Sequence, residues 1–158
     1  MRRSFADELY KCMKKDENIW VITMDLGYKL WDQIRDEFSD RFINCGAAEQ
    51  AGMGIAVGLA MEGKIPVVYS ITTFLLYRPF ETIRNYLNHE GIPIKLAASG
   101  RDKDYYIDGF SHDSTDAKRI LKNFKNIDTA WPEEKEEIPR LMDWFLYTKA
   151  PTFISLRR

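Results

Sequence analysis

The chain has 158 residues, 45% hydrophobic and 30% charged, which predicts one globular domain spanning residues 1–158. Its formal net charge of -1 offers no basic excess to attract nucleic acid or an anionic membrane. No apolar run approaches the roughly 20 residues of a membrane span, the first residues lack a secretory signal, and only two cysteines occur. We therefore expect a cytoplasmic protein without disulfides.

Short apolar or β-branched runs alternate with helical patterns along the whole chain. The predicted strands are 19–24, 41–45, 65–71, 92–98, 127–130 and 151–156. The predicted helices are 4–14, 31–38, 47–61, 74–88, 115–124 and 132–147, and residues 100–114 are predicted to form a long polar loop. Pro79 should kink the helix 74–88 or start a new one. The alternation predicts an α/β fold with three layers, α/β/α, around a mostly parallel sheet.

Sheets of this type bind ligands beyond the carboxyl ends of their strands. This rule directs attention to four segments that follow predicted strands. They are residues 25–29, 45–50, 71–77 and 99–112.

Glu49 is the first candidate for chemistry, because it lies just after a predicted strand, in the first turn of an apolar helix. A helix that is apolar on all sides is usually buried, so the carboxyl would lie at the edge of a site with little water. The alternative is that Glu49 merely caps its own helix, as acidic residues in a first turn often do. Its position alone favours the capping role.

The sequence around this glutamate resembles a known signature. Gly46-Ala47-Ala48-Glu49-Gln50, followed by Gly58-Leu59-Ala60 and Gly63-Lys64-Ile65-Pro66, resembles the pyrimidine-binding (Pyr) domain of transketolases. It is also similar to deoxyxylulose-phosphate synthases and to the β-subunits of 2-oxoacid dehydrogenases. The resemblance implies a Pyr-type fold that binds thiamine diphosphate. It also implies that Glu49 hydrogen-bonds a ring nitrogen of the aminopyrimidine and so promotes proton loss from the neighbouring thiazolium carbon.

Three aromatic residues follow at a spacing of three: Phe74, Tyr77 and Phe80. Such a stripe can simply pack one helix face on the core. The family places aromatics at this spacing around the aminopyrimidine ring, which implies that Phe74 and Tyr77 contact the cofactor. Phe80 fits either role. Four residues also resemble the family segment that ends in Ile-Arg: Arg78, Glu81, Ile83 and Arg84.

Two further segments resemble parts of the family's site. Asp108-Gly109-Phe110-Ser111-His112 is similar to the family's Asp-Gly-Pro-Thr-His, which implies that Asp108 and His112 bind substrate. His112 could polarise a substrate oxygen or shuttle a proton, or it could be a solvated loop histidine. Asp25-Leu26 resembles an Asp-Leu pair of the family, which implies that Asp25 contacts the cofactor.

The sequence departs from transketolases on the substrate side. The family's serine after Asp-Leu is Gly27, its motif proline is Phe110, and another family histidine falls here near Ser99 and Gly100. A non-standard sugar is therefore expected as substrate. Four residues of the altered loop are candidates for binding a different anion or polyol: Arg101, Lys103, Tyr105 and Tyr106.

The family also needs a diphosphate-binding domain with a Gly-Asp-Gly stretch, and this chain contains none. The resemblance therefore implies a partner subunit that holds the diphosphate and Mg²⁺ or Ca²⁺, in an α₂β₂ heterotetramer built on a Pyr–Pyr or Pyr–diphosphate-domain dimer. The apolar helix 47–60 would lie at that interface or in the core. No metal site is expected in this chain, because Cys45 has no second ligand near it in sequence.

The leading hypothesis is a Pyr subunit of a split transketolase-like enzyme, inactive without its partner, that transfers two-carbon ketol units. The alternatives are a β-type subunit of a 2-oxoacid decarboxylase or dehydrogenase and a nonenzymatic assembly or regulatory module. A nucleotide-binding α/β protein is a further alternative. Gly52, Gly54 and Gly58 resemble a dinucleotide motif but lie inside the predicted helix, so we expect them to serve close helix packing.

Overall fold

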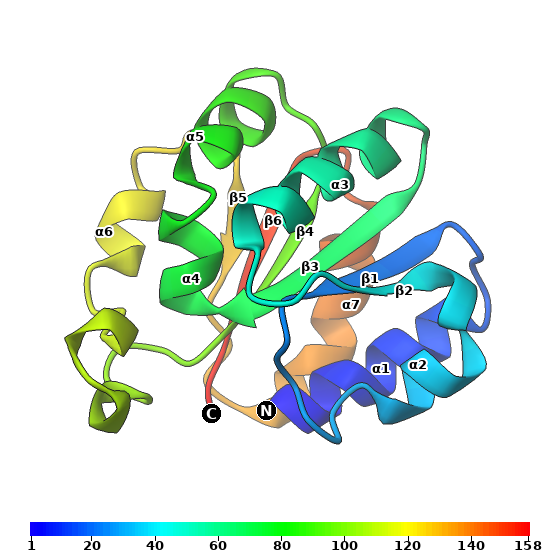
Figure 1. Cartoon of the computed structure of the whole chain (residues 1–158), viewed down its shortest axis with the longest axis horizontal. Helices are drawn as coiled ribbons and strands as arrows, with labels where there is room; N and C mark the ends of the chain where they lie inside the picture. Colours follow the sequence, from blue (N-terminus) through cyan, green and yellow to red (C-terminus); the bar gives the residue numbers. More distant parts are fainter.

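Six strands form one sheet in the order β2-β1-β3-β4-β6-β5, and every neighbouring pair runs parallel (Figure 1). This computed structural model describes residues 1–158. The strands are β1 (Ile19–Thr23), β2 (Phe42–Asn44), β3 (Ile65–Ile71), β4 (Lys95–Ser99), β5 (Asp128–Ala130) and β6 (Thr152–Leu156). Strands β4 and β6 are buried along their full length, as expected for a parallel sheet covered on both faces.

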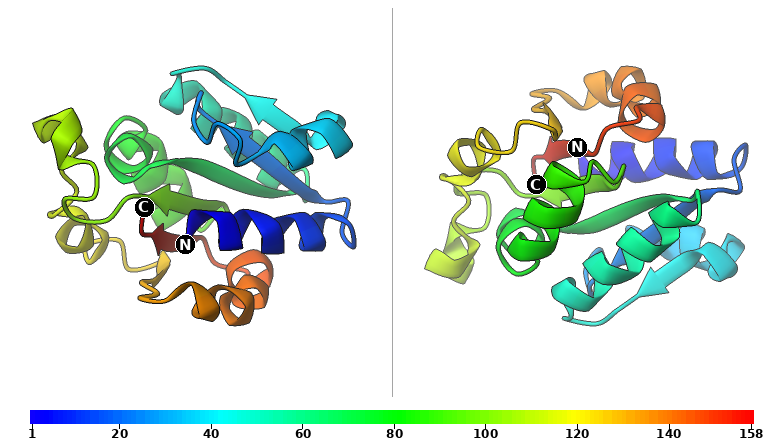
Figure 2. Two further views of the ribbon diagram at one scale, coloured as in Figure 1. Left: turned by 90° about the horizontal axis from the view of Figure 1, so that it is seen from below. Right: turned by 90° about the horizontal axis from the view of Figure 1, so that it is seen from above.

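Helices cover both faces of the sheet (Figure 2). One face carries α1 (Arg2–Met13), α2 (Asp32–Glu37) and α7 (Ile138–Tyr147). The other carries α3 (Glu49–Met61), α4 (Thr72–Tyr77), α5 (Phe80–Thr82), a π-helical segment (Ile83–His89) and α6 (Ala117–Leu121). The two faces bury clusters of 19 and 18 hydrophobic residues, so both layers contribute about equally and the predicted α/β/α arrangement is confirmed.

None of the helices combines the length and the apolar character that a membrane span requires. Short 3₁₀ turns complete the chain: Ser39–Arg41, Tyr106–Asp108, Phe110–His112 and Lys135–Glu137.

The predicted helix 74–88 differs from the structure at its start, whereas its break at Pro79 is as predicted. It begins two residues earlier, at Thr72, and is interrupted between Tyr77 and Phe80. Pro79 causes this break, because it lacks the N–H that a continuous helix needs. The chain resumes as α5 and the π-helical segment. The interruption leaves Arg78 at a corner between two helical segments.

Strand β4 also starts later than predicted, at Lys95 instead of Ile92. The N–H of Ile92 is already donated to the carbonyl of Tyr86, and Pro93 has no N–H to offer the sheet. Similarly, the predicted helix 115–124 is confined to α6. The long loop 100–114 contains two 3₁₀ turns.

Lys95 is a charged residue buried within β4 and gives the fold a pH dependence. Its Nζ donates to the carbonyl oxygens of Thr148 (2.6 Å) and Ala150 (3.0 Å), and its side chain is almost inaccessible. Burial lowers the pKa of Lys95 from 10.5 to about 8, although Asp128 partly opposes the shift. Between these two values the unfolded chain binds more protons than the native chain, so the free energy of unfolding rises with pH.

We therefore expect the wild type to gain about 2 kcal/mol of stability relative to Lys95→Met between pH 8 and 10.5, with partial solvation reducing the full linkage value. Urea unfolding of both proteins across this range measures the difference. Parallel pH profiles for the two proteins would contradict the assignment.

Candidate active site

The turn between β2 and α3 positions Glu49. The side-chain oxygen of Asn44 accepts hydrogen bonds from the backbone N–H groups of Asp25 (2.9 Å) and Gly46 (3.0 Å). The N–H of Cys45 donates to the carbonyl of Thr23 at 2.9 Å. Gly46 has a φ of +65°, which a glycine adopts without strain. This network joins the carboxyl ends of β1 and β2 and sets the start of α3 at the sheet edge where ligands bind in such folds.

Glu49 is the first residue of α3, and only 3% of its surface is exposed. Its Oε1 accepts a hydrogen bond from Nη1 of Arg78 at 2.6 Å. The Glu49 side chain makes no hydrogen bond to the backbone of its own helix. The carboxylate is therefore directed toward Arg78, which directly follows α4. It does not cap α3, in contrast to the alternative interpretation.

Phe74 and His112 complete a line of contacts that starts at Glu49. The guanidinium carbon of Arg78 lies 3.6 Å from the centre of the Phe74 ring. The other neighbour of that ring is His112, at a centroid distance of 5.0 Å and an interplanar angle of 64°. Nδ1 of His112 lies 3.1 Å from Oγ of Ser111. Three predicted site residues from three different segments are thus connected: Arg78 links Glu49 to Phe74, and Phe74 contacts His112.

Tyr77 and Phe80 point to other neighbours. The Tyr77 hydroxyl donates to Oδ1 of Asp116 at 2.5 Å, and burial followed by this hydrogen bond raises the pKa of the phenol well above its usual value. The Phe80 ring packs against Phe124 at 5.4 Å. Both aromatics therefore connect the α4–α5 region to α6 and the segment after it.

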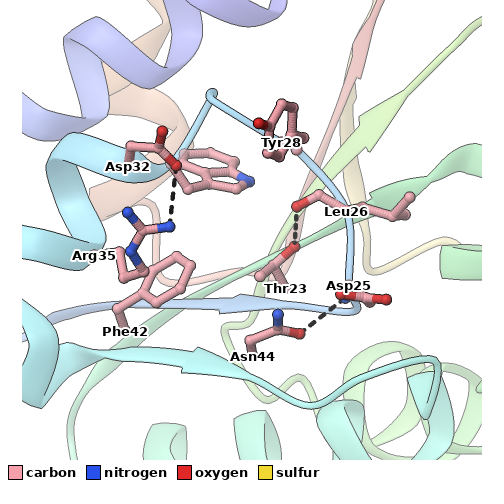
Figure 3. A pocket seen from close by; sticks show the side chains of 10 residues that line it. Thr23, Asp25, Leu26, Tyr28, Asp32, Arg35, Phe42 and Asn44 are labelled. Atoms are coloured by element: carbon pink, nitrogen blue, oxygen red, sulfur yellow. Dashed lines mark hydrogen bonds and ion pairs between the residues drawn. The ribbon is translucent and has the colours of Figure 1, made fainter.

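Asp25 lies in a separate cleft of about 420 Å³ beyond the ends of β1 and β2 (Figure 3). It adopts a left-handed backbone conformation with φ 54°, and Asn44 supports it through the hydrogen bond drawn in Figure 3. Across the same cleft, Arg35 pairs with Asp32 at 3.1 Å. Non-glycine residues in the left-handed backbone conformation cluster at functional sites.

Arg101 is turned into the protein. It is 5% exposed, and its guanidinium donates to the carbonyls of Pro132 (2.7 Å) and Ser155 (2.8 Å), to Oγ of Ser155 (3.1 Å) and to Oε1 of Glu133 (2.9 Å). These contacts tie the loop after β4 to β6 and correct the expectation that Arg101 faces a ligand. Asp108, by contrast, is exposed at the end of the turn Tyr106–Asp108.

The glycines of α3 divide between two faces. A Cβ on Gly52 would lie 2.7 Å from Cε of Met24, so this glycine serves the close packing that was predicted. A Cβ on Gly54 or Gly58 would meet nothing within 4 Å, and the expectation of close packing fails for them. They lie on the exposed face of α3.

The whole chain, residues 1–158, matches the family model described as "Transketolase, pyrimidine binding domain". The chain belongs to this family. Its Pyr domain spans about half the length of several curated relatives. It is 30% identical to a "Putative transketolase C-terminal section" of Methanocaldococcus jannaschii, covering 100% of this chain and 50% of the relative. It is 25% identical to one of the subunits of an apulose-4-phosphate transketolase of Phocaeicola vulgatus, covering 99% and 51%.

A third relative is the 6-deoxy-6-sulfo-D-fructose transketolase subunit of a Clostridium species, 25% identical over 100% of this Pyr domain and 49% of the relative. Among solved structures, a split-gene transketolase described as an inactive β4 tetramer superposes with a TM-score of 0.86 at 26% identity, covering 99% of this chain and 51% of that one. Transketolase from Leishmania mexicana gives a TM-score of 0.87 at 18% identity, covering 99% and 25%, and supports the fold alone. The expected Pyr-type fold is confirmed.

The residues of this Pyr domain fit an aminopyrimidine. The buried Glu49 carboxylate offers an acceptor, and Arg78 links it to the Phe74 ring, an aromatic face on which a flat heterocycle with N–H donors can stack. No group of three or more His, Cys, Asp or Glu side chains is placed to hold a metal ion. The carboxylate and the aromatic side chain thus match the organic ring of the cofactor.

Sequence reasoning gave Arg78 no role in the site. The available signal was its spacing: Arg78 follows Phe74 by four residues, which places the two side chains on one helix face. Asn44, which organises the turn before Glu49, was missed as well. An asparagine at a strand end before a glycine is a common turn signal and could have identified it.

Proposed function

We propose that this chain is the Pyr-domain part of a split, transketolase-like enzyme that depends on thiamine diphosphate and transfers two-carbon ketol units. The observation that carries the proposal is the buried Glu49 carboxylate, which Arg78 links to the Phe74 ring. When bound, thiamine diphosphate supplies a carbon nucleophile at its thiazolium ring. The protein's part is to hold a proton at the ring nitrogen of the aminopyrimidine through Glu49, where water is scarce.

The other site residues receive complementary roles. Phe74 stacks on the aminopyrimidine and excludes water, while Tyr77 holds the α6 side of the site through Asp116. His112, next to Phe74, polarises or protonates a substrate oxygen, and the exposed Asp108 binds a substrate hydroxyl. Asp25 contacts the cofactor from the cleft at the ends of β1 and β2. Phe80 packs against Phe124 and is left out of the site.

A partner chain completes the enzyme in this proposal. It binds the diphosphate together with Mg²⁺ or Ca²⁺, and the Pyr chain is inactive without it. The exposed face of α3 supports such a contact, because Ala51, Gly54 and Gly58 are small and Ile55 and Met61 are 41% and 69% exposed. An apolar face with small side chains allows close approach of a second chain. We propose an α₂β₂ heterotetramer in the cytoplasm.

The substrate is proposed to be a non-standard sugar. Relatives are named for apulose-4-phosphate and for 6-deoxy-6-sulfo-D-fructose, which are unusual sugars with an anionic group. The departures at Gly27 and Phe110, and at the positions around Ser99, support a changed substrate side in this chain.

Ligand-dependent thermal stability tests this function against the nucleotide-binding alternative. In the presence of the diphosphate-binding partner, thiamine diphosphate with Mg²⁺ should raise the melting temperature of the complex, because a ligand that binds only the native state stabilises it. At 100 times Kd the stabilisation is about 2.7 kcal/mol. NAD serves as the control and should have no effect. A shift with NAD and none with thiamine diphosphate would overturn the proposal.

A further inference from the structure

Arg78 occupies the space that a stacked heterocycle would need. Its Nη1 lies 2.6 Å from the Glu49 carboxylate, and its guanidinium carbon lies 3.6 Å from the centre of the Phe74 ring. A guanidinium is planar, carries several N–H donors and stacks well on aromatic faces. The buried acceptor and the aromatic face of the cofactor site are therefore both already engaged by a side chain of the same protein.

An aminopyrimidine presents the same combination of a flat ring and N–H donors. The Arg78 guanidinium lies 3.6 Å from the centre of the Phe74 ring. A ligand that stacks on the same ring face and hydrogen-bonds Glu49 would need that volume, because two groups cannot occupy it at once. Binding of such a ligand and the observed position of Arg78 are mutually exclusive.

The two members of this ion pair differ in how easily they can move. The Arg78 side chain is 44% exposed, while the Glu49 side chain is 3% exposed. Arg78 also lies at the break before Pro79, between α4 and α5. When the half-exposed Arg78 rotates away, water solvates its guanidinium and the N–H donors of the ligand replace it at the buried Glu49 carboxylate, so the carboxylate is not left unpaired. Glu49 has no such freedom, so the arginine is the member that can be displaced.

We propose that the Arg78 guanidinium occupies the aminopyrimidine position in the free chain, where it pairs with Glu49 and stacks on Phe74. Cofactor binding then requires displacement of Arg78. The inference rests on the proposed function. It gives the free chain a paired, stacked partner for a carboxylate that would otherwise be buried without a charge partner. The cofactor affinity of the isolated chain is lowered as a result.

Thiamine binding to the isolated chain tests this displacement. We expect Arg78→Ala to bind thiamine about tenfold more tightly than the wild type by isothermal titration or NMR shift titration, since the ligand no longer competes with an ion pair and a cation–π contact. Arg84→Ala is the matched control, because Arg84 is exposed and donates to Asn85 at 2.9 Å. It should bind like the wild type. Adding Glu49→Gln to Arg78→Ala should remove the gain.

Each outcome separates the inference from the proposed function. Equal thiamine affinity for Arg78→Ala and the wild type would overturn the displacement while leaving the cofactor site intact. Absence of thiamine binding in every variant would overturn it too, because there would be no position to close. If thiamine diphosphate with Mg²⁺ also failed to bind the wild type in the presence of the partner, the proposed function itself would fall. Unfolding curves of the variants verify that each one is folded during titration.

Discussion

Replacing Glu49 by glutamine is expected to lower turnover of the assembled enzyme by about a thousandfold, within the range typical for loss of a general acid–base group. The amide is nearly isosteric with the carboxyl and can still accept the hydrogen bond from Arg78, so folding and association with the partner should persist. It cannot hold and release a proton at a ring nitrogen. Steady-state kinetics and analytical ultracentrifugation of the same reconstituted complex measure the two properties.

Glu62→Gln provides the control for this substitution. Glu62 directly follows Met61, the last residue of the helix that Glu49 begins, and it is exposed. The same chemical change there should leave turnover unchanged. Near-normal turnover for Glu49→Gln would remove Glu49 from the chemistry and return it to a structural role at the start of α3.

Arg101→Met is expected to lower the free energy of unfolding by about 3 kcal/mol, because it leaves the carbonyls of Pro132 and Ser155 and the Ser155 hydroxyl without the donor they have in the native chain. Buried groups that lose a partner cost about 1–3 kcal/mol each, and some will recover part of this cost through water. Glu133 contributes less, because it is 64% exposed and can rehydrate.

Arg157→Met is the matched variant, since Arg157 pairs with the same Glu133 at 3.1 Å but is 42% exposed. Its effect should stay within about 0.5 kcal/mol, as for most exposed ion pairs. Urea unfolding of the two variants gives the comparison. Similar small effects at both positions would mean that Arg101 does not tie the loop to β6, and it would again become a candidate for binding an anion.

The alternation of strands and helices could be predicted from the sequence, because each strand and helix has its own local hydrophobic pattern. The runs 19–24 and 65–71 are β-branched and apolar, and they form adjacent parallel strands. The start of β4 could not be predicted from a local pattern. It depends on a hydrogen bond between Ile92 and Tyr86 that exists only once the π-helical segment has formed.

The candidate site was predictable where a single motif carried it. Glu49 was proposed from its position after a strand together with the family resemblance, and Phe74 and His112 from the same resemblance. The structure links the three through contacts, and their roles stay predictions. The contact between Arg78 and Glu49 was not predicted, because it joins residues 29 positions apart and depends on the helix break at Pro79. Arg101 was assigned to the wrong side of its loop, because its partners in β6 lie 54 residues away.

The rate of proton exchange at the reactive thiazolium carbon tests the role of Glu49 most directly. Quenched-flow deuterium exchange followed by NMR can measure it in the complex of this chain with its diphosphate-binding partner, without any substrate. A carboxyl that acts on the aminopyrimidine should make exchange much faster than in free thiamine diphosphate, and Glu49→Gln should return it close to the free rate at full cofactor occupancy. Exchange at the wild-type rate in the saturated Glu49→Gln complex would contradict the account.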